Sequence, residues 1–290
     1  MDSENALINV GDLAKPATVL IEKISGAIGT LYLPHHIRKV ARAEADAATI
    51  RALAGVEIND IQHRALVRMI QGEVKKQENI EAISSGAIEG LNPSTKPEDI
   101  DNDWLSNFFD KCKLISNQEM QSLWSRILSG EANKPGTFSK RTVELVSSLE
   151  KKDADLFTRL CRFGCMIGQL TPIIFDSEEV IYKSHGITFA ELTHLDNLGM
   201  IRFESLAGFQ LTMNSNRVVI SYYGTPIVLE LAQRANQKIK VGKVLLSSAG
   251  RELAPICGST RIDEFVEYVV RKWRDDGVIA SSPWPRPASV

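Results

Sequence analysis

The side chains whose types and spacing come nearest to a chemical site are two cysteines. Cys161 and Cys165 lie four residues apart, which is about one turn of a helix and suits two ligands of one metal ion. A structural zinc site needs further ligands, and no other Cys or His pair in the sequence has the required spacing. A free cysteine is usually a small buried hydrophobic residue. We therefore predict no metal site at this pair.

Three alternating aspartates, Asp99, Asp101 and Asp103, resemble part of a cation-binding loop. The glycine and the distal glutamate of a calcium-binding loop are missing from this stretch. An aspartate that precedes a helix accepts hydrogen bonds from the first backbone N–H groups of that helix. We therefore expect these aspartates to cap a helix that begins near Trp104.

Sequence motifs of common enzymes are missing throughout the chain. It has no Walker phosphate loop, no G-x-G-x-x-G, no nucleophile elbow and no H-E-x-x-H. Each of these motifs places the groups on which a reaction depends, so the usual routes to an enzyme lack their residues. We predict a non-enzymatic protein with no catalytic residues, no cofactor and no metal.

Composition limits the remaining functions. The chain has 290 residues, of which 43% are hydrophobic and 24% charged, so it should bury a sizeable core in about two or three domains. Its 34 basic and 36 acidic residues give a net charge of −2, which provides no general attraction for nucleic acid. Four cysteines without a secretory signal indicate a reducing compartment. We expect a protein of the cytoplasm or of the inner face of the inner membrane.

A central helical domain over residues 102–168 is the part of the chain that the sequence specifies most clearly. Ser116 and Glu119 have the spacing of a capping box at the start of its second helix. Gly130 and the loop that follows it are expected to end that helix, and Ser139 to cap a third. The apolar residues of all three helices recur at helical spacing, so this block should form a packing centre.

Residues 1–34 form an apolar amphipathic segment. Glu22 and Lys23 interrupt it, so it is too short and too charged to predict a membrane span. Ser25 and Gly29 are small residues one helical turn apart, which allows another helix to approach closely. The apolar stripe either lies on a membrane or packs on a helix of this chain or of a partner. Its predicted contact residues are Val19, Leu20, Ile24, Ile28 and Leu31.

Residues 35–90 read as one very long helix or two nearly collinear helices. Apolar residues recur there every eleven positions, a period that keeps them on one face of a nearly straight helix. A continuous helix would be about 80 Å long at 1.5 Å per residue, too long to be buried in one small domain. We therefore predict self-association through this helix. The predicted interface residues are Ala47, Ile50, Ile58, Ile61, Met69 and Ile80.

A basic cluster lies just after the apolar segment. Arg38, Lys39 and Arg42 are expected to contact anionic lipid headgroups if the segment lies on a membrane. Because Glu44 and Asp46 are close by, a solvated helix end is the alternative.

The second half of the chain follows a linker at residues 91–101, which is rich in proline and poor in apolar residues. Residues 169–280 are expected to form a winged-helix-like α+β domain, and residues 281–290 a disordered proline-rich tail. The expected helices are 152–167, 189–198, 248–256 and 262–273, and the expected strands are 172–175, 200–204, 209–213, 218–223 and 238–246. A turn at residues 214–216 should join two of these strands into a hairpin. The fold class is thus mainly α (α+β), with a long N-terminal helix, a central helical block and a C-terminal winged-helix-like domain.

A winged helix raises the alternative of a DNA-binding transcriptional regulator. The recognition helix would be residues 189–198, which offer Glu191, His194 and Asp196 but neither Arg nor Lys. DNA binding needs cations that displace counterions, and usually Arg to read base edges. This module is therefore expected to bind a protein partner rather than nucleic acid.

The linker, the text DNDWLSNFFDKC at residues 101–112 and the block QSLWSRILSGEANKPGTFSKRT at residues 121–142 resemble an uncharacterised bacterial family, domain of unknown function 2806. The layout is also similar, more loosely, to the abortive-infection alpha proteins, with residues 123–131 as the comparable block. The second resemblance implies a role in phage defence or growth arrest, and neither supplies catalytic residues. We expect an oligomeric membrane-associating or scaffold component of a phage-defence or stress response. Its expected partners are other copies of the chain, an anionic membrane surface and a protein bound through the C-terminal domain.

Overall fold

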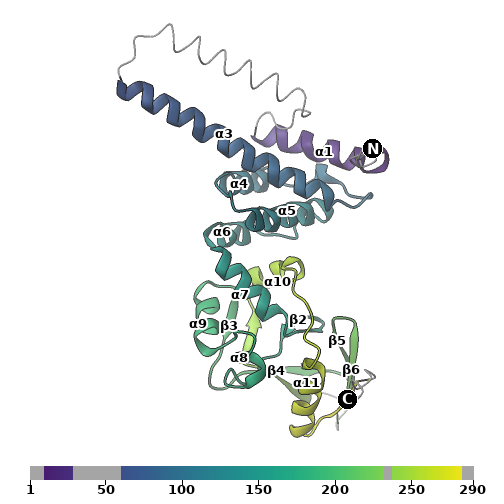
Figure 1. Ribbon diagram of the computed structural model, residues 1–290. Helices are drawn as coiled ribbons and strands as arrows, with labels where there is room; N and C mark the ends of the chain where they lie inside the picture. The colour runs from purple at the N-terminus through teal and green to yellow at the C-terminus, as the bar shows by residue number, and fades with distance from the viewer. Residues whose placement is uncertain (1–9, 29–59, 232–236, 283–290) are drawn as a thin grey trace, which may run out of the picture. The chain divides into compact units, whose positions relative to one another are not determined.

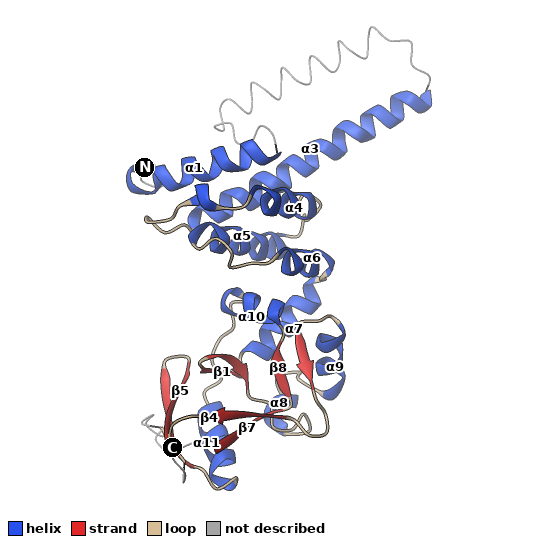
Figure 2. Ribbon diagram, turned by 180° about the vertical axis from the view of Figure 1, so that it is seen from behind, coloured by secondary structure: helices blue, strands red, loops and turns tan. Residues whose placement is uncertain are grey.

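The computed structural model describes residues 10–28, 60–231 and 237–282. The chain divides into two compact units, Met1–Val143 and Glu144–Val290. The first unit is helical and the second combines helices with antiparallel strands (Figures 1 and 2). The predicted class, mainly α (α+β), is therefore confirmed.

The first unit consists of a layer of helices around an aromatic core. Helix α1 packs on α4 and on the short helix η1, and α3 packs on α5 (Figure 1). The last helix, α6, continues into the second unit. The elements are α1 (Val10–Ile28), α3 (Asp60–Glu89), η1 (Pro97–Asp99), α4 (Asn102–Cys112), α5 (Gln118–Asn133) and α6 (Lys140–Ser148).

The core of the first unit is a cluster of buried rings at the centre of the block that the sequence specifies most clearly. Phe108 stacks on Trp104, and its ring meets that of Trp124 edge-on, with centroids 5.0 Å apart in both pairs. The indole N–H of Trp104 donates to the carbonyl of Phe138 at 2.7 Å, so this buried polar group is satisfied. The apolar residues that recur at helical spacing in the sequence thus pack together in one core.

Side-chain caps begin these helices, two of them as predicted. The Asp101 carboxylate accepts the Trp104 N–H at 2.7 Å, and the Ser139 hydroxyl accepts the Thr142 N–H at 3.2 Å. The predicted capping box at Ser116 is wrong. Asn117 directly precedes α5, and its amide oxygen accepts the N–H groups of Glu119 and Met120. Asparagine caps a helix as well as serine does, so the neighbouring residue takes this role.

Of the two signals predicted to end α5, the loop is correct, because the helix ends at Asn133 where that loop begins, and Gly130 is wrong. Gly130 lies inside the helix, where a Cβ atom would come within 2.7 Å of the Phe138 ring. The glycine therefore allows a close packing contact and does not stop the helix.

The second unit is built on a five-stranded antiparallel sheet in the order β2-β1-β5-β6-β9, with two further strand pairs, β3–β8 and β4–β7. Helix α11 covers the sheet through its buried apolar residues. The strands are β1 (Gly164–Ile167), β2 (Gln169–Pro172), β3 (Ile201–Phe203), β4 (Phe209–Met213), β5 (Arg217–Tyr222), β6 (Thr225–Glu230), β7 (Gln237–Gly242), β8 (Val244–Leu246) and β9 (Ile279–Ser281). The helices are α7 (Lys151–Cys161), α8 (Val180–Lys183), α9 (Phe189–Asn197), α10 (Ser248–Leu253), η2 (Ala254–Ile256) and α11 (Phe265–Asp275).

The predicted order of helix, helix and paired strands is present, but the strands are different ones. After α8 and α9, strand β3 pairs with β8, and the predicted hairpin of β4 with β5 is wrong. The hairpin instead joins β5 to β6, where Tyr222 lies opposite Thr225. The two residues between them, Tyr223 and Gly224, have φ angles of 46° and 82°. Positive φ at both central positions gives the turn that best matches the twist of paired strands.

The predicted helix over residues 152–167 is too long. Helix α7 ends at Cys161, and strand β1 carries Cys165. The two cysteines are therefore not on one helix face. The predicted disordered tail begins inside β9, and its residues 283–290 lie outside the described residues.

Candidate functional site

The predicted membrane-contact stripe lies on α1, where it contacts helices of the same chain. Leu20 and Ile24 are completely buried, while Val19, Ser25 and Ile28 are half-buried. The Lys23 ammonium donates to the backbone carbonyl of Glu98, in η1, at 3.0 Å. None of the described helices is both long and apolar enough to cross a bilayer. The predicted residues Gly29 and Leu31, like the headgroup residues Arg38, Lys39 and Arg42, lie outside the described residues.

The predicted self-association helix is described from Asp60 onwards, as α3. Ile61 and Met69 are 70% and 59% exposed, whereas Ile80 is half-buried and Ile83 fully buried. The two ends of α3 thus differ, one exposed to solvent and the other packed on α5. The remaining predicted interface residues, Ala47, Ile50 and Ile58, lie outside the described residues.

The packed half of α3 is held on α5 by close backbone approach and by hydrogen bonds. The Ser125 hydroxyl donates to the carbonyl of Ile83 at 2.9 Å. A Cβ atom at Gly86 would come within 2.6 Å of the same hydroxyl oxygen, so this crossing requires a glycine. The Asn79 side chain adds a bond from Gln121, at 3.1 Å. This half of α3 is therefore part of the packed core of the first unit.

The sequence did not reveal one buried carboxylate, which lies in α5. Glu131 is 2% exposed and accepts hydrogen bonds from the N–H groups of Gly136, at 2.6 Å, and Phe138, at 2.8 Å. Such charge-assisted bonds are short and strong. They fix the loop before α6, so Glu131 has a structural role.

Polar side chains of α9, the predicted recognition helix, are used inside the second unit. His194 Nε2 lies 2.7 Å from Asp153 Oδ1, which is buried at the start of α7. Asp196 accepts the Phe203 N–H at 3.1 Å, and Glu191 accepts from the Thr188 hydroxyl. These contacts hold α9 in place, and its sequence has no Arg or Lys that could meet a phosphate.

The two cysteines are buried in the core of the second unit. Burial raises the pKa of the Cys165 thiol to about 12, so this thiol is protonated at neutral pH. Metal ligation needs the thiolate. Among the residues that the structure describes, no group of three or more His, Cys, Asp or Glu side chains is placed to hold a metal ion.

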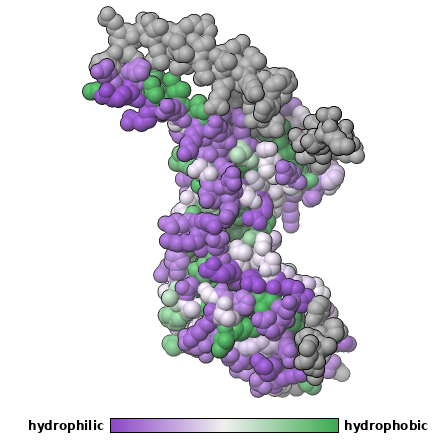
Figure 3. All heavy atoms as spheres, viewed as in Figure 1, coloured by the Kyte–Doolittle hydropathy of each residue, from purple (hydrophilic) through white to green (hydrophobic). Residues whose placement is uncertain are grey.

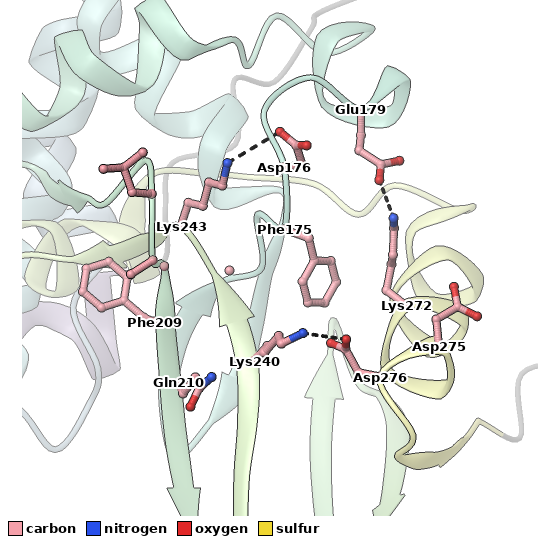
Figure 4. A pocket seen from close by; sticks show the side chains of 14 residues that line it. Phe175, Asp176, Glu179, Phe209, Gln210, Lys240, Lys243, Lys272, Asp275 and Asp276 are labelled. Atoms are coloured by element: carbon pink, nitrogen blue, oxygen red, sulfur yellow. Dashed lines mark hydrogen bonds and ion pairs between the residues drawn. The ribbon is translucent and has the colours of Figure 1, made fainter.

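The second unit has a pocket of about 440 Å³ lined by charged and aromatic side chains (Figure 4). It opens between the strand pair β4–β7 and helix α11, and the Phe175 ring points into it. Three ammonium groups, those of Lys240, Lys243 and Lys272, surround this ring (Figure 4). Sequence analysis missed the site because its walls come from segments that are far apart in the chain.

Three ion pairs line this pocket, and they differ in length. Lys240 Nζ lies 2.7 Å from Asp276 Oδ1, and Lys272 donates a short hydrogen bond to Glu179. That hydrogen bond raises the pKa of Lys272, which keeps the ammonium charged at neutral pH. The third pair, Lys243 with Asp176, is 3.7 Å long, which is beyond hydrogen-bond distance.

Backbone contacts fix the floor of the pocket. The Phe175 N–H donates to the Tyr182 hydroxyl at 3.2 Å, and that hydroxyl donates to the carbonyl of Ile173 at 2.9 Å. Gly242, with φ of +100°, lets the end of β7 cross this segment, because a Cβ there would lie 2.1 Å from the Ile174 carbonyl oxygen. Lys243, which follows Gly242, is thereby held beside Phe175 at the floor of the pocket. The site is built in advance of any ligand.

Comparison with known proteins agrees with the main resemblance in the sequence and gives no support to the looser one with abortive-infection alpha proteins. No curated protein and no solved structure matches the chain. A family model matches residues 63–270, which include most of α3, all of α4, α5 and α6, and most of the second unit. The chain therefore belongs to the family described as protein of unknown function (DUF2806).

Proposed function

We propose that the protein is a non-enzymatic scaffold that associates with other copies of itself through α3. The observation that carries this proposal is the exposure of Ile61 and Met69 on the half of α3 that begins at Asp60. In Figure 3, hydrophobic surface lies between hydrophilic side chains at that end of the helix.

The exposed residues belong to the same helix face that is buried further along. Met69 precedes Ile80 by eleven residues, and Ile61 precedes Ile83 by twice that number. Eleven residues make very nearly three turns, so Met69 lines up with Ile80 and Ile61 lines up with Ile83, in two neighbouring rows on one face of α3. The face that meets α5 at one end thus continues as an apolar row at the other. A second copy of the same row would cover it, since identical surfaces pair around a two-fold axis.

Membrane contact through α1 receives less support. Leu20 and Ile24 are buried against this chain's own helices, so a lipid-bound α1 would first have to leave them. Exposing each of these side chains costs about 1.5–3 kcal/mol. We include in the proposal that residues 1–34 insert into a membrane only when the chain oligomerises, and sedimentation with anionic vesicles tests this. Equal sedimentation of the parent and of a chain that lacks residues 1–34 would exclude it.

The test of self-association is the concentration dependence of mass in sedimentation equilibrium. We expect the double substitution I61E/M69E to raise the dissociation constant at least about 100-fold, because each apolar side chain contributes about 1.5–3 kcal/mol when buried. The matched control is Q71E, which places one carboxylate on an exposed position of the same helix, away from the row. A monomeric parent, or a parent and double variant of equal mass, would rule out the scaffold.

The cellular part of the proposal, a role in phage defence or in another stress response, rests on resemblance. Cells that express the parent chain should give fewer plaques than cells that express I61E/M69E. Equal plaque counts for the parent, this variant and an empty vector across a panel of phages would remove the defence role.

A further inference from the structure

We propose that the pocket between the β4–β7 pair and α11 binds a small molecule that carries one carboxylate beside an aromatic or branched apolar group. This site lies in the second unit and goes beyond the self-association proposed for α3. Three features of the pocket define the ligand: the balance of charge, the aromatic rings and the pairing of Lys243.

Lys243 is the lysine that a ligand would engage. Its side chain is 24% exposed, less than those of the other two pocket lysines. Its paired oxygen, Asp176 Oδ1, is 3.7 Å away and already accepts the Glu178 N–H at 3.1 Å. An ammonium has three donors, and Lys243 makes no hydrogen bond to this carboxylate at that distance. A ligand carboxylate at Lys243 would form the charge-assisted hydrogen bond that Asp176 does not.

The balance of charge restricts the ligand to one negative charge. Four carboxylates line the pocket with the three lysines, so the site as a whole is slightly acidic. A phosphate monoester or a nucleic acid would bring several charges against Asp275 and Asp276, which like charges oppose. A monocarboxylate adds only one negative charge, and the Lys243 ammonium compensates it.

The apolar part of the ligand would lie on the rings of the pocket. Phe175 is half-buried and packs edge-on against Trp273, with centroids 6.2 Å apart, so its position is fixed from behind. Phe209 of β4 and Leu206, which is 91% exposed, are further apolar residues that line the pocket. An aromatic or branched group would remove these apolar atoms from water.

Ligand-observed NMR titration of the full chain tests this inference with phenylacetate as the probe. We expect phenylacetate to bind with millimolar affinity, as befits so small a ligand. Benzylamine has the same ring with the opposite charge, and inorganic phosphate has charge without a ring. Both should bind at least tenfold more weakly. Benzylamine that binds as well as phenylacetate, or no saturation by phenylacetate, would refute the site.

Three substitutions then locate the binding. K243Q should weaken phenylacetate binding about tenfold, because it removes a charge-assisted bond. K238Q, on β7 but outside the pocket, should leave the affinity unchanged. D176N keeps the oxygen that accepts the Glu178 N–H but removes the competing charge, so it should tighten binding.

The last variant keeps the test decisive even if K243Q proves unstable. A merely structural ion pair gives no reason for D176N to tighten the binding of a carboxylate. Weaker or unchanged binding by D176N, in a chain with an unaltered circular dichroism spectrum, would therefore contradict the proposal.

Discussion

Glu131 accepts hydrogen bonds from two backbone N–H groups of the loop that follows its own helix, at 2.6 and 2.8 Å. Asp153 is similarly buried at the start of α7, where it accepts the Glu150 N–H at 3.0 Å and meets His194. A buried carboxylate is often read as a catalytic group. In this protein both carboxylates accept hydrogen bonds from backbone N–H groups, and Asp153 also holds the His194 side chain of α9, so each residue fixes the position of neighbouring segments.

For Glu131, substitution by glutamine should lower the free energy of unfolding by about 2 kcal/mol, since bonds to a charged acceptor contribute about 1.5–3 kcal/mol. The glutamine side chain keeps one acceptor oxygen for one of the two backbone N–H groups. Its NH2 group then faces the other backbone N–H, so that two donors meet. Urea unfolding measures the change, with E89Q at an exposed position of α3 as the control. An equal effect of the two substitutions would show that the loop bonds contribute nothing.

For Asp153, the pH dependence of stability is the measurement. Burial raises its pKa, but the hydrogen bond to His194 and the bond from Glu150 outweigh burial, so the pKa is lowered on folding. A lowered pKa adds stability above the unfolded value, about 3.9, and this stability is lost as the pH falls through the folded value. H194Q removes the main lowering partner. Its acid unfolding should therefore begin at a higher pH than that of the parent.

D153N is the control for this prediction, because it removes the titrating group. In the D153N background, H194Q should leave the pH of acid unfolding unchanged. A shift of the same size in both backgrounds would mean that His194 acts through another group.

At the scale of elements, the helices of the first unit could be predicted because each carries its own signals. Asp101 and Ser139 are caps that act within three residues, and apolar spacing marks the buried faces of α4 and α5. The strand pairing could not be predicted in this way. Residues 214–216 and 223–224 both have turn chemistry, and pairing depends on which strands meet in space. The apolar run after Cys161 fits a helix and a strand equally well.

Two glycines of α3 allow a direct test of how this helix is used. G86A should destabilise the first unit by about 1–3 kcal/mol, because the new methyl group meets the Ser125 hydroxyl. G72A should stabilise it by about 1 kcal/mol, since a Cβ there meets nothing within 4 Å and alanine favours the helix. Chemical unfolding of the two variants measures both effects. Changes of the same sign would mean that α3 does not cross α5 as described.

At the scale of the whole molecule, the apolar row of α3 lies within the first unit and the walls of the pocket lie within the second. The row could be predicted because its period is local. The pocket could not, because Phe175, Lys243 and Lys272 come together only through the fold of the second unit. Only the first of the two proposed binding surfaces was therefore visible in the sequence.

The two surfaces should act independently. A ligand shifts an assembly only if it binds the assembled and separate forms with different affinity. Since no pocket residue lies in the first unit, phenylacetate should leave the sedimentation mass of the parent unchanged. By reciprocity, I61E/M69E should bind phenylacetate as the parent does, and K243Q should assemble as the parent does. A change of mass on adding phenylacetate that K243Q abolishes would instead identify the pocket as a regulator of assembly, with the coupling free energy given by the ratio of the two affinities.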